Sequence, residues 1–267
     1  MIQEIYSFEE YEGFIAELAG HPLFSDPHFT YSKENLYRSL KRKDEYAYAV
    51  SENGITEGLF VWLVLPDERY LEMIIGFTRK EEAFAEMLSY MERNHCGYSL
   101  DFVFNPLNTA ISGALKKRGA IFDPEQQKMI LTGTTPNVST SQIELLSEKW
   151  TKQYCDLHST DTYWTAERIL ASQDKFRVLL AVKDGQIKGY LDVQYCYDIN
   201  EIYALFVKPE AAQQGYELAL LVKAAELNRP NQMMAVVDAD AKEEIELYMA
   251  AGFTRMEGQN SITAYIR

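Results

Sequence analysis

The sequence predicts an α/β (α+β) protein with two tandem domains, each a mixed, mostly antiparallel sheet flanked by helices. Its length of 267 residues corresponds to one large or two small domains. An uncharged stretch rich in Gly, Pro, Ser and Thr, TGTTPNVSTS at residues 132–141, divides the chain nearly in half. The predicted elements follow the same order on both sides of this stretch. We therefore expect domains at residues 1–135 and 136–267.

The first half shows five strand patterns, one hairpin turn and two helical patterns. Asn53-Gly54 is a typical hairpin turn between two apolar runs. Residues 79–94 and 109–118 have helical spacing, and Gly119 ends the second helix. The predicted strands are residues 46–50, 59–65, 70–77, 98–104 and 128–131.

The second half repeats this order, with a turn at Asp184-Gly185. Val50 and Val182, like Gly119 and Gly252, are separated by about 132 residues, which indicates duplication of one unit. Helical patterns cover residues 163–171, 217–227 and 243–251. The predicted strands are residues 177–182, 187–194, 201–207, 233–237 and 262–266.

Charge and cysteine content exclude several classes of protein. The net charge of −14 repels phosphate backbones and anionic lipid, so we expect no nucleic-acid or membrane partner. It would suit a cationic partner. Three dispersed cysteines form no disulfide framework or CxxC motif. Residues 1–14 lack a basic start and an apolar core, so we expect no signal peptide and a cytoplasmic protein.

The segment of residues 200–221 carries the strongest signal for a binding site. A predicted strand ends at Pro209, a loop containing Gly215 follows, and a helix begins. The first turn of a helix offers unpaired amide groups and a positive dipole end to an anion. The alternative is an ordinary connection between a strand and a helix, because one glycine is a weak signal.

This segment resembles the acetyl-CoA signature of the GNAT superfamily of N-acetyltransferases, which is V-x-P followed by a Q/R-x-x-G-x-G/A loop and a helix. Val207-Lys208-Pro209 matches the first part, and residues 247–253 (LYMAAGF) match the downstream L-Y-x-x-x-G-F motif. The resemblance covers residues 177–267 well, whereas the first half lacks both motifs and reads as a degenerate copy. It implies acetyl-CoA as a co-substrate, held by Phe206, Val207, Ala212, Gln213, Gln214, Gly215, Tyr216 and Glu217.

Two positions of the loop depart from the family pattern. Ala212 stands where the pattern has Gln or Arg, and Glu217 stands where it has Gly or Ala. The carboxylate of Glu217 should repel a pyrophosphate unless it points away. This departure motivates a second hypothesis, in which the module binds CoA or a partner without turnover.

The resemblance also suggests catalytic groups. Glu201 matches the glutamate that serves as a base in some members, and Tyr248 matches the tyrosine that protonates the departing thiolate. A backbone amide near Phe206 or Val207 would stabilise the oxyanion. The alternatives are a solvated strand-end carboxylate for Glu201 and a packed aromatic ring for Tyr248.

The sequence therefore predicts an enzyme that transfers acetyl from acetyl-CoA to the primary amine of a small molecule or peptide, by direct attack in a ternary complex. A longer acyl group or an aminoacyl group is a further alternative for the donor. We expect no metal site, because Asp238 and Asp240 precede a helix whose first turn favours acids. The acceptor and the oligomeric state are not predicted.

Overall fold

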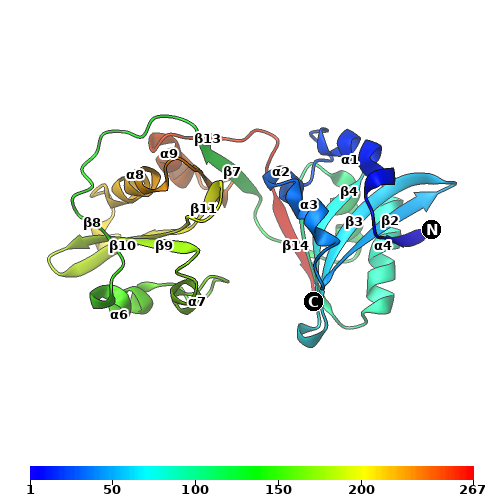
Figure 1. Cartoon of the computed structure of the whole chain (residues 1–267), viewed down its shortest axis with the longest axis horizontal. Coiled ribbons are helices and arrows are strands. Elements are labelled where there is room, and N and C mark those ends of the chain that lie inside the picture. Colours follow the sequence, from blue (N-terminus) through cyan, green and yellow to red (C-terminus); the bar gives the residue numbers. More distant parts are fainter. The chain divides into compact units, whose positions relative to one another are not determined.

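The computed structural model describes residues 1–267 and forms two compact units. Unit 1 contains residues 1–127 and 257–267, and unit 2 contains residues 128–256. Each unit is built on a seven-stranded sheet with helices on both faces (Figure 1). None of the helices combines the length and the apolar character that a membrane span requires.

The sheet of unit 1 has the strand order β1-β2-β3-β4-β5-β14-β6. Its strands are β1 (Ile2–Ile5), β2 (Glu45–Glu52), β3 (Ile55–Leu65), β4 (Tyr70–Thr78), β5 (Ser99–Phe104), β6 (Ile121–Phe122) and β14 (Ile262–Ile266). Its helices are α1 (Glu12–Ala19), α2 (Pro27–Tyr31), α3 (Glu34–Ser39), α4 (Glu81–Asn94) and α5 (Thr109–Lys117). All neighbouring strands whose registers are defined run antiparallel except β4 and β5.

Two cores cover the faces of this sheet. The α4 and α5 side chains pack on one face, where the predicted helical stripe of α4 is buried, including Phe84, Met87 and Met91. The short helices α1–α3 cover the other face with side chains such as Leu18 and Leu36. Because each face of the sheet is closed by helices, β3 carries an uninterrupted apolar run from Leu59 to Leu65.

The sheet of unit 2 has the strand order β13-β7-β12-β11-β10-β9-β8. Its strands are β7 (Gln126–Leu131), β8 (Ile143–Leu145), β9 (Phe176–Lys183), β10 (Gln186–Gln194), β11 (Ile199–Val207), β12 (Gln232–Asp238) and β13 (Phe253–Arg255). Its helices are α6 (Glu148–Leu157), α7 (Ala166–Ala171), α8 (Tyr216–Asn228) and α9 (Lys242–Ala250). Helices α8 and α9 lie on one face and α6 and α7 on the other (Figure 1).

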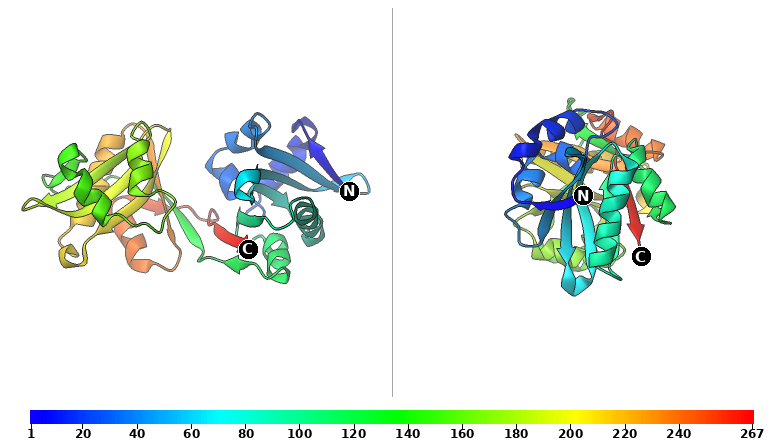
Figure 2. Two further views of the ribbon diagram at one scale, coloured as in Figure 1. Left: turned by 90° about the horizontal axis from the view of Figure 1, so that it is seen from below. Right: turned by 90° about the vertical axis from the view of Figure 1, so that its right-hand side faces the viewer.

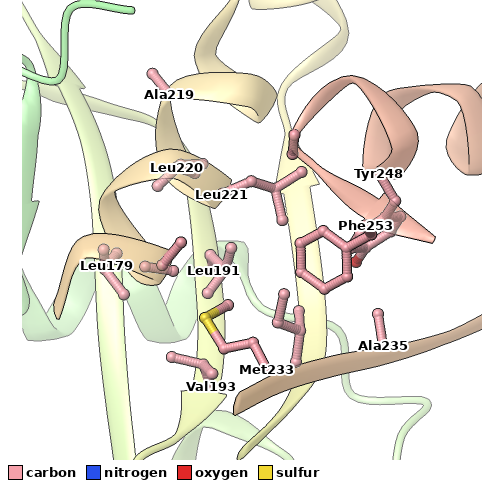
Figure 3. Close-up of a cluster of buried hydrophobic side chains, with 14 of the residues drawn as sticks. Leu179, Leu191, Val193, Ala219, Leu220, Leu221, Met233, Ala235, Tyr248 and Phe253 are labelled. Atoms are coloured by element: carbon pink, nitrogen blue, oxygen red, sulfur yellow. The ribbon is translucent and has the colours of Figure 1, made fainter. Parts of the chain in front are cut away.

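The core between the sheet and helices α8 and α9 is the larger of the two cores in unit 2. Leu220 and Leu221 of α8 contact the strands, where Leu191 and Met233 are fully buried (Figure 3). Tyr248 of α9 packs its ring against Phe253 at the same face (Figure 3).

The last strand predicted for each half of the sequence belongs to the sheet of the other unit, so the domain bounds predicted from the sequence were wrong. Residues 128–131 were expected to close the first half, but β7 pairs with β13 in the sheet of unit 2. Residues 262–266 were expected to close the second half, but β14 lies between β5 and β6 in unit 1 (Figure 2, red strand). The chain consequently passes between the units at residues 127–128 and 256–257, whereas the division expected was 1–135 and 136–267.

The stretch at residues 132–141 is irregular, as predicted, but it lies within unit 2. The amides of Thr132 and Gly133 both donate to the carbonyl of Gly252. A Cβ on Gly133 would approach that carbonyl to 3.0 Å, so the close passage favours glycine. The start of the stretch is thus packed against Gly252, just after α9, and the stretch does not join the two units.

Candidate functional site

Strands β11 and β12 of unit 2 separate partway along their length. Their parallel pairing runs from Ile199 opposite Gln232 to Ile202 opposite Ala235 and then stops, although β11 continues to Val207 and β12 to Asp238. A bulge on β11 at Tyr203 shifts its register against β10 at the same point. The centre of the sheet therefore opens between the carboxyl-terminal parts of these two strands.

The opening exposes a strand edge whose backbone groups have no partner strand. The amide of Lys208 donates to the carbonyl of Lys188 on β10 at 2.8 Å. Because backbone groups alternate in direction along a strand, Phe206 also faces β10, whereas Leu205 and Val207 face the opening. Of the two residues predicted to supply an oxyanion donor, only Val207 thus has its amide on the open edge.

The loop after β11 leads directly to the first turn of α8. A short 3-10 helix (Pro209–Ala211) follows the strand, and Gln213 and Gly215 adopt positive φ angles of 60° and 79°. Gly215 is the N-cap of α8 and supplies no side-chain acceptor. The amides of Tyr216, Glu217 and Leu218 therefore point out of the helix without a partner in the protein.

A cavity of about 460 Å³ lies at this helix start. Gln214 and Gly215 line it on one side, and Ser139, Ser141 and Gln142 line it on the other. Hydroxyl groups, a side-chain amide and a helix N-terminus together suit an anion. Ala212 and Gln213, which were predicted to hold the cofactor, are exposed and do not line this cavity.

Glu217 occupies the first turn of α8 and is half-buried, and it does not line the cavity. Any repulsion between the Glu217 carboxylate and an anion bound in the cavity would therefore come from beside the cavity. Tyr216 is buried in the core and anchors the start of the helix.

Glu201 and Tyr248, the two predicted catalytic residues, lie on opposite faces of the sheet. Asn200 donates to Asn228 of α8 at 2.7 Å, so the next residue, Glu201, faces the α6 and α7 side. Tyr248 is 3% exposed and lies in the core on the α8 and α9 side. The two side chains are not in contact, and only a group held in the opening between β11 and β12 would approach both.

The surroundings of Tyr248 keep its hydroxyl group protonated. Burial, together with the nearby Glu244, raises the pKa of Tyr248 well above 10, so its hydroxyl remains a proton donor at neutral pH. Burial lowers the pKa of Lys128, and the charge of Glu201 acts in the opposite direction. Nowhere in the chain do three His, Cys, Asp or Glu side chains come together as a metal site.

A buried polar network joins β10 to α6 and was not found from the sequence. Asp192 of β10 is fully buried and accepts from the Tyr154 hydroxyl at 2.9 Å. Its second oxygen lies 2.9 Å from Nε2 of His158, whose ring stacks on Tyr190. Tyr190 in turn contacts the ring of Phe206. The one available signal was a carboxylate in the apolar run of residues 189–193 (GYLDV).

Unit 1 has the same opening, but its own side chains fill it. Pairing between β4 and β5 stops at Met73 opposite Phe102, and a bulge falls at the next residue, Ile74. Beyond it, the amide of Gly76 donates to Asp26 at 2.9 Å, and Nδ1 of His28 lies 2.7 Å from the carbonyl of Ile74. The Asn108 side chain donates to the carbonyl of Thr78 at 3.0 Å.

Asp26 is held firmly in this position. It caps α2 by accepting from the amide of Phe29 at 3.0 Å, and Pro27 fixes the first turn of the helix. Burial raises its pKa to about 6, against the opposing effects of His28 and of the backbone donors. The strand edge that is open in unit 2 is therefore hydrogen-bonded in unit 1.

Comparisons with known proteins agree with this geometry. Residues 141–253 match the model of the acetyltransferase (GNAT) family. No curated protein sequence matches the chain. Among solved structures, a GCN5-related N-acetyltransferase from Sphaerobacter thermophilus has 14% identity and a TM-score of 0.64, covering 88% of this chain and 85% of that one.

Two further structures match over nearly their whole lengths. A tandem GNAT protein from the clavulanic acid biosynthesis pathway, solved without AcCoA, has 11% identity and a TM-score of 0.54, covering 100% of this chain and 98% of that one. A GCN5-related N-acetyltransferase-like protein from Streptococcus suis has 14% identity and a TM-score of 0.53, covering 97% of this chain and 99% of that one. At these identities the similarity shows a shared fold, which confirms the prediction of two tandem modules.

Proposed function

We propose that the protein transfers acetyl from acetyl-CoA to a primary amine by direct attack, because residues 141–253 match the model of the acetyltransferase (GNAT) family. The observation that carries this proposal is the open edge of β11, which leads without interruption to the unpaired amides of α8. The resemblance implies the cofactor, and the open edge offers a place for it.

The donor would lie along this edge in extended form. Amide groups of its pantetheine arm would pair with the backbone of Leu205 and Val207, in the manner of an added strand. Its pyrophosphate would accept from the amides of Tyr216, Glu217 and Leu218, with Gln214 and Gly215 beside it. The serines at the cavity rim would face the nucleotide end.

The acyl transfer then needs three groups at the opening. The amine nitrogen forms a bond to the thioester carbon, and the carbon–sulfur bond breaks as the tetrahedral intermediate collapses. Glu201 accepts the proton that the amine loses, directly or through water, and Tyr248 donates its proton to the departing thiolate. The amide of Val207 would stabilise the negative oxygen.

Calorimetry with acetyl-CoA and with CoA tests the proposal on the full chain. We expect one binding site per chain, because the corresponding edge of unit 1 is occupied by Asp26, His28 and Asn108. Two equivalent sites would contradict our interpretation of unit 1. An absence of binding at millimolar ligand would overturn the proposed function, whereas binding without turnover of any amine would favour the non-catalytic module.

A further inference from the structure

An aromatic cluster lies on the α6 and α7 face of unit 2, formed by Tyr163, Trp164, Phe176 and Tyr203. The Trp164 ring centre lies 4.6 Å from that of Phe176 and 6.0 Å from that of Tyr203. Tyr163 packs edge-on against Trp164 at 5.3 Å. The outer rings are open to solvent, with Tyr163 71% exposed and Tyr203 39% exposed. Two exposed rings thus pack against the half-buried Trp164, which lies on the buried ring of Phe176.

The aromatic cluster adjoins the proposed base. Tyr203 and Glu201 stand two residues apart on β11 and face the same side of the sheet, a separation of roughly 6–7 Å along the strand. Tyr203 is also the bulged residue at which the opening of the sheet begins. An acceptor amine that reaches Glu201 from this face would therefore bring the rest of its molecule against these rings.

A polar atom without a partner lies under the aromatic cluster. Gln194 of β10 is 8% exposed, and its Nε2 donates to the Tyr203 hydroxyl at 3.3 Å. Its Oε1 is buried and has no hydrogen-bond partner in the protein. If the amide were turned over, its nitrogen would lack a partner instead. A buried polar atom of this kind usually has a partner, so its environment is incomplete.

Two cations lie beside the aromatic cluster and the proposed base. The Arg168 guanidinium stands over the Tyr163 ring at 4.5 Å, and Lys128 lies near Glu201. The carboxylate of Glu201 favours one amino group at this point, whereas Arg168 and Lys128 disfavour further positive charges on the acceptor. The face therefore favours an acceptor with a single amino group and a flat apolar body.

From these observations we infer that the acceptor is an aromatic primary amine whose ring carries a hydroxyl group. This inference rests on the proposed function. The ring would stack or pack edge-on against Trp164 and Tyr203, and the amine would face Glu201. A phenolic hydroxyl both donates and accepts a hydrogen bond, so it would pair with Gln194 in either orientation of the amide once the Tyr203 ring moves aside and uncovers the buried atom.

The test measures CoA release from acetyl-CoA with tyramine, phenethylamine and spermidine as acceptors. Tyramine and phenethylamine differ only in the ring hydroxyl, so their ratio of kcat/KM reports that one group. We expect tyramine to exceed phenethylamine by about three- to tenfold, the usual net effect of one hydrogen bond, and spermidine to be the poorest acceptor.

Two variants locate the effect. Gln194→Leu should reduce the ratio between tyramine and phenethylamine toward one, whereas Gln186→Leu, at an exposed position at the start of the same strand, should preserve it. Tyr203→Ala should raise KM for both aromatic amines while the affinity for acetyl-CoA stays unchanged. Because Tyr203 is partly exposed, this variant remains informative if Gln194→Leu does not fold.

The outcomes separate this inference from the proposed function. Equal kcat/KM for tyramine and phenethylamine, or a preference for spermidine, would overturn the aromatic acceptor and leave the acetyltransferase intact. Failure of acetyl-CoA to bind in the calorimetry experiment would overturn the proposed function itself.

Discussion

At the scale of single residues, the chemistry that we propose for unit 2 depends on two ionisable side chains, Glu201 and Tyr248. Tyr248 is buried against Phe253, and its raised pKa keeps the hydroxyl protonated. A phenol that stays neutral over the physiological range can donate a proton to a thiolate but cannot act as a base.

Tyr248→Phe should therefore lower turnover at neutral pH by about a hundredfold, the lower end of the usual contribution of a positioned proton donor. The ring and its packing are retained, so the dissociation constant of acetyl-CoA should hardly change. Steady-state kinetics and calorimetry measure the two quantities separately. Tyr98→Phe in unit 1 is the matched control, and unchanged turnover in Tyr248→Phe would remove Tyr248 from this role.

His158 provides a prediction about stability and pH. Burial lowers its pKa, but the hydrogen bond to Asp192, the Ser159 carbonyl and the charge of Asp192 raise it by more, so the net pKa lies above the usual 6.5. A group with a raised pKa in the folded state stabilises the protein below its unfolded pKa, and this stabilisation is lost as pH rises through the folded value.

The free energy of unfolding should accordingly fall as pH increases from about 6 upward, through the raised pKa of His158. Urea unfolding at a series of pH values measures this slope. The slope should flatten in His158→Gln and persist in His21→Gln, which changes an exposed histidine. An equal slope in wild type and His158→Gln would show that the His158–Asp192 pair is not its source.

At the scale of elements, the N-terminus of α8 is the feature on which anion binding depends. Glu217 stands in its first turn, where a carboxylate interacts favourably with the helix dipole but competes with a bound anion. Glu217→Gln should tighten acetyl-CoA binding by about two- to fivefold, from the usual magnitude of a charge at a helix end. Glu226→Gln, near the other end of the same helix, should have no effect. Unchanged affinity in Glu217→Gln would mean that the carboxylate points away.

Most long elements of both units could be predicted from the sequence, because their apolar side chains recur at strand or helix spacing. The buried stripe of α4, including Phe84 and Met87, is one example. Helix α6 was missed because it buries only Trp150 and Tyr154 in ten residues, too few to show a period. Helices α1–α3 were missed for the same reason, because each is short and buries too few side chains to show a helical period.

The candidate site, too, could be predicted from the sequence only in part. The loop residues and Glu201 stand out because they belong to a local motif. The groups that fill the opening of unit 1 do not, since Asp26 and Gly76 are fifty residues apart and meet only in the fold. The aromatic cluster likewise joins the α6–α7 connection to two strands, which no local pattern reveals.

At the scale of the whole molecule, the exchange of β7 and β14 determines which fragments can fold. A fragment of residues 1–135 lacks β14, so Ala264 leaves the core of unit 1 and β6 loses its one neighbour. We expect this fragment to unfold without cooperativity in a thermal melt followed by circular dichroism. Residues 1–127 joined to 257–267 by a short Gly/Ser linker should melt cooperatively, because Gln126 and Ser261 are already hydrogen-bonded neighbours. Cooperative melting of residues 1–135 alone would refute this view of unit 1.

The position of β14 also has a consequence for biosynthesis. A ribosome makes the first 127 residues of unit 1 before any part of unit 2, but the strand that completes the sheet of unit 1 follows the last residue of unit 2. Unit 2, by contrast, is one uninterrupted segment. The unit that is translated first is therefore completed last. Until β14 has been synthesised, strand β5 has no hydrogen-bonded neighbour on one of its two sides.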